Sequence, residues 1–465
     1  MSDPYRHAGR TFFRATVVAA SLAVSIAVAA VTAARAETLE EALTKAYENN
    51  PTLLAARARL RATDEGVSQA LSGWRPTVSL SYDVGKDYTS TNGSSRTSRN
   101  STPRGGGLSL DQNVYEGGKT VATTARAEQE VLAERARLAS TEQDIMLRAA
   151  TAYTNVLRDQ AVLRLTQSNE RVLQRQLEAT RDRFQVGEVT RTDVAQAESR
   201  LSRSTSERIA AEGELAKSRA DYRDVVGDFP GTLQPARPAV DIPASQDGAS
   251  EQARSGNPAV ISARFNERAA AAGIRVARAD LLPTVDIEGD MSRDHDVSST
   301  VERSDGASIV ATLSVPLYQA GAVSSRIREA RQIHSQRLRE LDAAVRSAVA
   351  TATQAWESYQ TARAQISAFD AEVRAASIAL EGVRQEAQVG SRTVLDVLDA
   401  EQELLNARVS LVRARRDEVV TSFDVRRSIG TLLATRLNLP VAAYDFESYY
   451  RSVRNKWWGW ETGRE

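Results

Sequence analysis

The stretch Phe184–Val194, FQVGEVTRTDV, is nearly repeated at Ala387–Val397 as AQVGSRTVLDV, 203 residues later (387 minus 184). Val-Gly, a threonine and Asp-Val stand in register in the two copies. Glycine adopts the left-handed conformation that ends many helices, and Thr-x-x-Asp has the form of a helix-starting capping box. We therefore predict two helical hairpins that turn at Gly187 and Gly390, with return helices capped by Thr190 and Thr393.

The duplication extends over most of the chain. Asn50-Pro51 matches Asn257-Pro258 at an offset of 207 (257 minus 50), and Gly118 matches Gly321 at 203 (321 minus 118). Self-similarity of this kind indicates one structural unit built twice. The predicted division is a signal peptide (1–36), a first repeat (37–227), a Pro-rich linker (228–256), a second repeat (257–433) and a tail (434–465). The first repeat contains a β-hairpin at about 77–115 and a helical hairpin at about 118–227. The second contains a β-hairpin at about 284–318 and a helical hairpin at about 321–433.

Long proline-free segments follow each predicted β-hairpin, between Pro103 and Pro230 and between Pro316 and Pro440. Apolar residues recur in them every seven positions, which is typical of coiled-coil packing. At 1.5 Å per residue, the nearly 70 residues from Gly118 to the first tip predict a rod on the order of 100 Å long.

Each repeat also carries two short runs in which apolar residues alternate with polar ones, such as Val78-Leu80-Tyr82-Val84, separated by a polar loop. This gives four amphipathic strands. An open four-stranded sheet has unpaired edges and is not stable in a bilayer, so closure requires other copies. Two copies would supply eight strands, and three copies would supply twelve strands and twelve long helices. The predicted fold is mixed but mostly α, with a β-barrel shared between copies and continued by a helical tunnel.

The N-terminus predicts export from the cytoplasm. Four basic or histidine side chains precede an uncharged apolar run, 15–34, and Ala34-Arg35-Ala36 has the small-x-small form of a signal-peptide cleavage site; a single membrane anchor is the alternative. The chain contains no cysteine, so it has neither disulfides nor an N-terminal lipidated cysteine. Its 60 basic and 60 acidic side chains give no electrostatic argument for nucleic acid.

Taken as an ordered set, the motifs VYEGGK (114–119), PLYQAG (316–321) and the two tip sequences resemble the TolC family of outer-membrane efflux and secretion channels. The resemblance covers about 37–433. It implies a homotrimer with a twelve-stranded barrel in outer-membrane lipid and a periplasmic tunnel. The implied partners are a periplasmic adaptor (membrane fusion) protein and an inner-membrane transporter of the ABC or RND type. Without an acylated cysteine, the chain resembles the branch that serves multidrug efflux and type I protein secretion.

Candidate functional residues lie at the tips. Asp396 and Asp399 are three positions apart on one helix face, so three copies would form two carboxylate rings able to attract cations. The resemblance makes these residues the periplasmic aperture and makes Arg392, together with Asp193, part of the links that close it. For Asp193 the simple capping role is the favoured interpretation. Ala387 departs from the family, which often has tyrosine there.

Catalytic chemistry is not indicated. The three histidines are scattered, and no GxSxG, P-loop or HExxH pattern occurs, so we expect neither an enzyme nor a cofactor or metal centre. A periplasmic coiled-coil adaptor is the competing class, but it would not need two amphipathic β-hairpins. For the aromatic tail, with Tyr449-Tyr450 and Trp457-Trp458-Gly459-Trp460, packing against the bundle is expected over a binding role.

Overall fold

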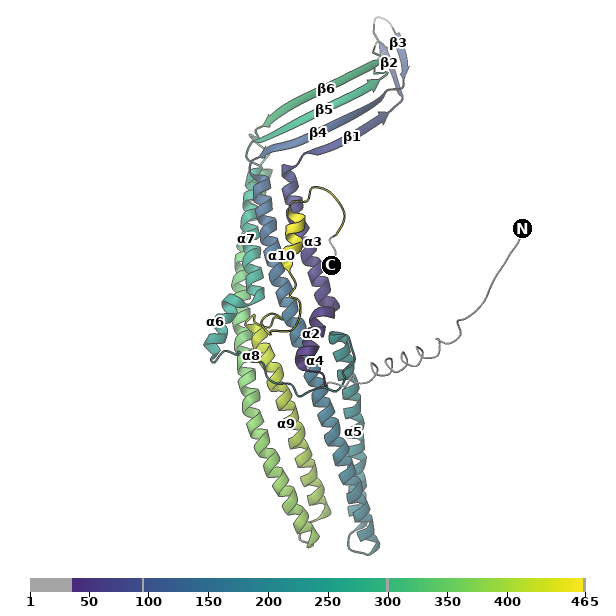
Figure 1. Ribbon diagram of the computed structural model, residues 1–465, viewed down its shortest axis with the longest axis vertical. Coiled ribbons are helices and arrows are strands. Elements are labelled where there is room, and N and C mark those ends of the chain that lie inside the picture. Colours follow the sequence, from purple (N-terminus) through teal and green to yellow (C-terminus); the bar gives the residue numbers. More distant parts are fainter. Residues whose placement is uncertain (1–35, 94–95, 298–300, 463–465) are drawn as a thin grey trace, which may run out of the picture.

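The computed structural model describes residues 36–93, 96–297 and 301–462. The molecule is elongated, with a long helical bundle that carries a tilted β-sheet at one end (Figure 1). Nearly all of the predicted signal peptide lies outside the described residues. No helix of the described part is long and apolar enough to cross a membrane.

The helices repeat in the same order in both halves. The first half contains α2 (Leu39–Asn49), α3 (Pro51–Leu71), α4 (Lys119–Gln185) and α5 (Arg191–Val226), with a 3₁₀ turn at Ser72–Trp74. The second half contains α6 (Gln246–Gly256), α7 (Pro258–Ala279), α8 (Ala322–Gln388) and α9 (Val394–Ser428), and α10 (Phe446–Arg454) follows. With 67 residues each, α4 and α8 are rods of about 100 Å.

Helix α6 corrects the predicted linker. The segment 228–256 was expected to be a linker throughout, but α6 occupies its last eleven residues and lies 207 positions after α2 (246 minus 39). Its Gly- and Ser-rich sequence is typical of a loop. The helix is stabilised by Ala249 and Ala253, which are fully buried one turn apart. The second repeat therefore begins near 246, and only the segment before it is extended.

The sheet has the order β1 (Thr77–Val84), β4 (Arg104–Glu116), β5 (Thr284–His295) and β6 (Arg303–Ser314), all antiparallel. Two predictions for its loops were wrong. The polar segment of the first repeat forms a further pair, β2 (Asp87–Asn92) and β3 (Arg96–Ser101). In the second repeat, β5 and β6 extend through most of the region expected to be loop, because backbone pairing continues where the hydrophobic alternation ends.

The sheet is amphipathic. Val78 pairs with Leu110 and Leu80 pairs with Leu108, so these side chains share an apolar face with Ile309 of β6. On this face Leu80 and Ile309 are 82% and 85% exposed. The opposite, acidic face contains no Lys or Arg in the four strands as described, and its carboxylates are Asp83, Asp111, Glu116, Asp286, Glu288, Asp290 and Asp294.

The main core lies at mid-height, where α2, α3, α4, α5 and the C-terminal part of α9 meet the segment before α6. The hydroxyl of Tyr153, fully buried on α4, donates to the carbonyls of Glu37 (2.8 Å) and Gln234 (2.7 Å). The Glu37 amide donates to the Thr232 carbonyl at 2.7 Å. These hydrogen bonds tie the first described residues and the segment before α6 to helix α4.

Candidate functional site at the helical tips

Both hairpins turn at the glycines that the sequence indicates. Gly187 and Gly390 have φ of 83° and 80°. The amide of Glu188 donates to the Arg183 carbonyl at 2.9 Å, and that of Ser391 donates to the Glu386 carbonyl at 3.0 Å. These bonds satisfy carbonyls at the ends of α4 and α8, as in a glycine-terminated helix. The two tips thus share one backbone design.

The return helices begin with complete capping boxes. The amides of Thr190 and Thr393 donate to Oδ2 of Asp193 (2.8 Å) and Asp396 (2.9 Å). In the other direction, the amides of Asp193 and Asp396 donate to the threonine hydroxyls at 3.3 and 3.2 Å. The bonds from Thr393, first from its backbone and then from its hydroxyl, lower the pKa of Asp396, with help from Arg392. Asp396 therefore caps its helix as Asp193 does, in addition to any role in an aperture.

Arg392 binds within its own hairpin. Its Nε donates to Glu386 Oε2 at 2.8 Å, and both side chains are about half exposed. The predicted link between Arg392 and Asp193 is not among the ion pairs of the described chain, so it stays a prediction for contacts between copies. Ala387, beside Glu386, has no side-chain polar group to contribute to such a link.

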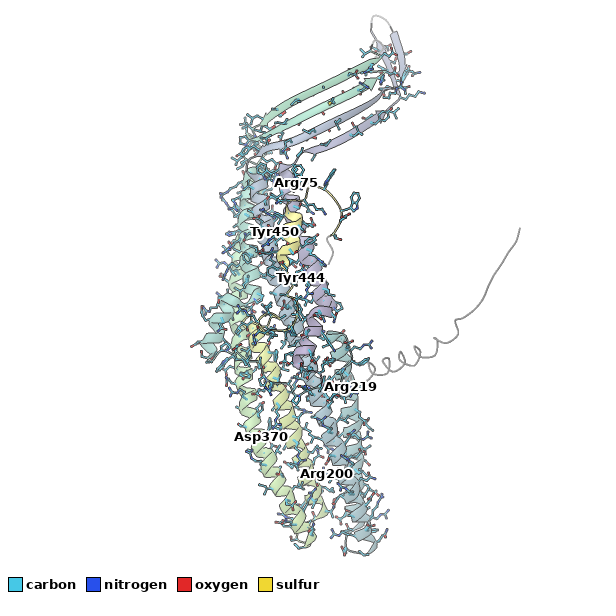
Figure 2. All side chains as sticks on the ribbon, viewed as in Figure 1. Arg75, Arg200, Arg219, Asp370, Tyr444 and Tyr450 are labelled. Carbon is cyan, nitrogen blue, oxygen red and sulfur yellow. The ribbon has the colours of Figure 1, made fainter. Side chains whose placement is uncertain are left out.

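Asp399 is joined to the first hairpin. Its Oδ1 accepts an ion-paired hydrogen bond from Arg200 on α5. Arg200 lies toward the lower end of the molecule (Figure 2). No motif in the sequence indicates Arg200, because this pairing depends on how one hairpin leans on the other. Asp399 and Asp396 thus make different contacts, one between hairpins and one within a helix cap.

A small apolar cluster accompanies this ion pair. Near the tips, two residues of α9 pack against three of the first hairpin, and their exposed fractions are 8% or less. We call this set the latch cluster: Leu173, Leu177, Ala197, Val394 and Leu398. Higher up, Val419 and Phe423 of α9 are buried in the main core, and polar contacts join α9 to α4, including Arg416 to Asn155 at 2.8 Å. The hairpins of one chain are therefore held at their tips by a contact of few residues.

The described residues at the tips do not form a candidate metal site. Within the described residues, no set of three or more His, Asp or Glu side chains is placed to hold a metal ion. Carboxylate rings at the tips would need further copies of the chain.

Comparison with known proteins identifies the family. Residues 42–228 and 249–431 match the model of the family described as outer membrane efflux protein. Outer membrane efflux protein BepC of Brucella suis is 34% identical over 97% of this chain and 98% of its own length. Outer membrane protein TolC of Vibrio cholerae is 29% identical over 85% and 91%.

A solved structure of an outer membrane channel has a similar fold. The Campylobacter jejuni CmeC outer membrane channel superposes with a TM-score of 0.78 at 16% identity, covering 90% of this chain and 89% of that one. The resemblance seen in the sequence is confirmed, and so is the mostly α fold. The chain therefore belongs to the outer membrane efflux protein family, whose members are export channels of the outer membrane with a helical tunnel in the periplasm.

Proposed function

We propose that three copies of this chain form an export duct whose periplasmic end is held shut by the latch cluster and the Arg200–Asp399 pair. The observation that carries the gate is the small contact between the hairpin tips. Because the tips touch each other through so few side chains, they can separate below the level at which Val419 and Phe423 hold α9 in the main core. The same feature favours opening by tilting of α8 and α9 as a unit.

Trimer formation is supported by the sheet edges. In the order β1-β4-β5-β6, strands β1 and β6 each have one unpaired edge, which is not tolerated in hydrocarbon. Pairing β1 of one copy with β6 of the next closes the sheet, and three copies give twelve strands, enough for a pore. The apolar face would then contact lipid and the acidic face would line the lumen, which favours passage of cations.

Opening of the duct would depend on partner proteins. A periplasmic adaptor shifts the equilibrium only if it binds the separated tips better than the closed ones, and an inner-membrane transporter of the ABC or RND type would load the duct. Drug efflux and type I protein secretion both fit this arrangement, because the proposed duct has no pocket that would select its cargo. Selection of cargo belongs to the transporter.

Single-channel conductance of the purified protein in planar bilayers tests the proposal. Hexamminecobalt, a trivalent cation, is added on the side of the helical tips to wild type and to Asp396→Ala/Asp399→Ala. We expect small openings that the cation blocks in wild type, and larger openings with weaker block in the variant, which lacks both the carboxylate rings and the Arg200–Asp399 pair. Equal block in both proteins would place the cation site elsewhere, and absence of channels would refute the duct.

A further inference from the structure

The C-terminal tail exposes three indole rings. Trp457, Trp458 and Trp460 are 68%, 91% and 96% exposed. Such large aromatic side chains are normally mostly buried, and clustered exposure marks an interaction surface. The expectation that the tail packs on the bundle holds for α10, where Val453 is buried, but not for these three residues.

These residues form a compact loop. Lys456 Nζ donates to the Glu461 carbonyl at 2.9 Å, which joins the ends of the segment 456–461. Between the second and third tryptophan, Gly459 has a φ of 111°, a conformation that glycine adopts easily and tryptophan does not. We call the segment 456–461 the indole loop.

The loop lies at the base of the sheet. Arg75 Nη1 donates to the Lys456 carbonyl at 2.7 Å, and its guanidinium lies 5.3 Å from the ring centroid of Trp457. Arg75 stands two residues before β1, whose apolar face begins at Val78. Arg75 is located where the helical bundle meets the sheet (Figure 2). The indoles are therefore close to the level at which the membrane-facing surface starts.

Helix α10 holds the loop at this level. Tyr449 donates from its hydroxyl to Glu65 Oε1 at 2.7 Å, and Arg454 donates to Glu128 Oε1 at 2.8 Å, so α10 is attached to both α3 and α4. Asp445 caps its first turn. A loop that is anchored in this way loses little conformational entropy when it binds a second surface.

We propose that the indole loop inserts into the phospholipid headgroup region at the periplasmic surface of the outer membrane, as an anchor outside the sheet. Tryptophan prefers this interface because its ring is apolar and its N–H stays near water. Arg75 and Lys456 place positive charge next to the indoles, which suits anionic headgroups. Continuity with the apolar face of β1 favours lipid over a protein partner. The inference rests on the outer-membrane location and not on the proposed gate.

Lipid quenching of fluorescence tests the anchor. Trp74→Phe/Trp356→Phe leaves the indole loop as the only source of tryptophan emission. The full-length protein is reconstituted into vesicles of phosphatidylcholine that is brominated either near the headgroup or near the chain end. We expect blue-shifted emission that headgroup-proximal bromine quenches strongly and chain-end bromine quenches weakly. Arg75→Ala should reduce the quenching because the loop loses its attachment at the base of the sheet.

A matched control retains only Trp356, through Trp74→Phe/Trp457→Phe/Trp458→Phe/Trp460→Phe. The Trp356 indole N–H donates to the Pro243 carbonyl at mid-bundle, and its emission should be unaffected by either lipid. Unquenched emission from the tail would overturn the proposal: red-shifted emission would mean water, and blue-shifted emission would mean burial against another copy or protein. Should the phenylalanine variants not assemble, Trp458→Cys carrying an environment-sensitive dye gives the same readout in the otherwise cysteine-free chain. Conductance measured in parallel separates a failed anchor from a failed duct.

Discussion

Leu398→Ala tests the latch cluster most simply. Leu398 is 2% exposed and packs against the first hairpin at the tips. Burial of a leucine side chain stabilises a contact by about 2 kcal/mol, and a trimer contains three such contacts, which together give about 6 kcal/mol. Moving a two-state equilibrium from mostly closed to mostly open takes about 5.5 kcal/mol. The substitution should therefore populate the open state without any partner.

Single-channel recording checks this prediction. We expect Leu398→Ala to show larger and longer openings than wild type. The control is Leu380→Ala, a buried leucine of α8 that lies outside the latch cluster, which should lower thermal stability without enlarging the openings. Wild-type openings in Leu398→Ala, or the same enlargement in Leu380→Ala, would refute the reasoning.

Three further predictions concern charge, burial and backbone. Arg200→Glu should increase open probability modestly, because an exposed pair contributes about 0 to 1 kcal/mol per copy, and Arg200→Glu/Asp399→Arg should reverse most of the increase in the same recordings. Burial raises the pKa of Asp64 from 3.8 to about 6, and neither of its carboxylate oxygens has a hydrogen-bond partner among the described residues. A raised carboxyl pKa stabilises the fold at low pH, and this stability is lost as the pH rises through about 6. Asp64→Asn should therefore raise the Tm at neutral pH. It should not raise the Tm near the carboxyl's ordinary pKa, and thermal melts at the two pH values check this. Gly390→Ala should lower stability by about 1 kcal/mol, since alanine is strained in the left-handed conformation, and an unchanged Tm would argue against a fixed tip.

Much of the fold was predictable because the sequence contains the same structural unit twice. Two tip sequences in register gave the turns at Gly187 and Gly390 and both capping boxes, since these depend on residues within one helical turn. Period-two alternation located β1 and the apolar parts of the other long strands. The family followed from the order of the motifs.

Features that depend on packing or on backbone pairing were missed. Helix α6 has a loop-like composition and forms because two alanines are buried. Strands β2 and β3 are polar, so they lack the period-two alternation that indicates a half-buried strand. The Arg200–Asp399 pair joins residues 199 positions apart, and only the lean of one hairpin on the other brings them together. The indole loop was expected to be packed, but its three indoles are exposed, whereas α10 before it is attached to α3 and α4.

The central claim is that the hairpin tips must separate for the duct to open widely. Ala197→Cys/Leu398→Cys places a thiol on each side of the latch cluster in a chain without other cysteines, and a short, reducible thiol crosslinker can join them. Conductance of the same preparation is recorded before crosslinking, after it, and after reduction. We predict large openings before crosslinking, because Leu398 is lost, small ones while the tips are joined, and large ones again after reduction. Equal conductance in all three states would contradict the account.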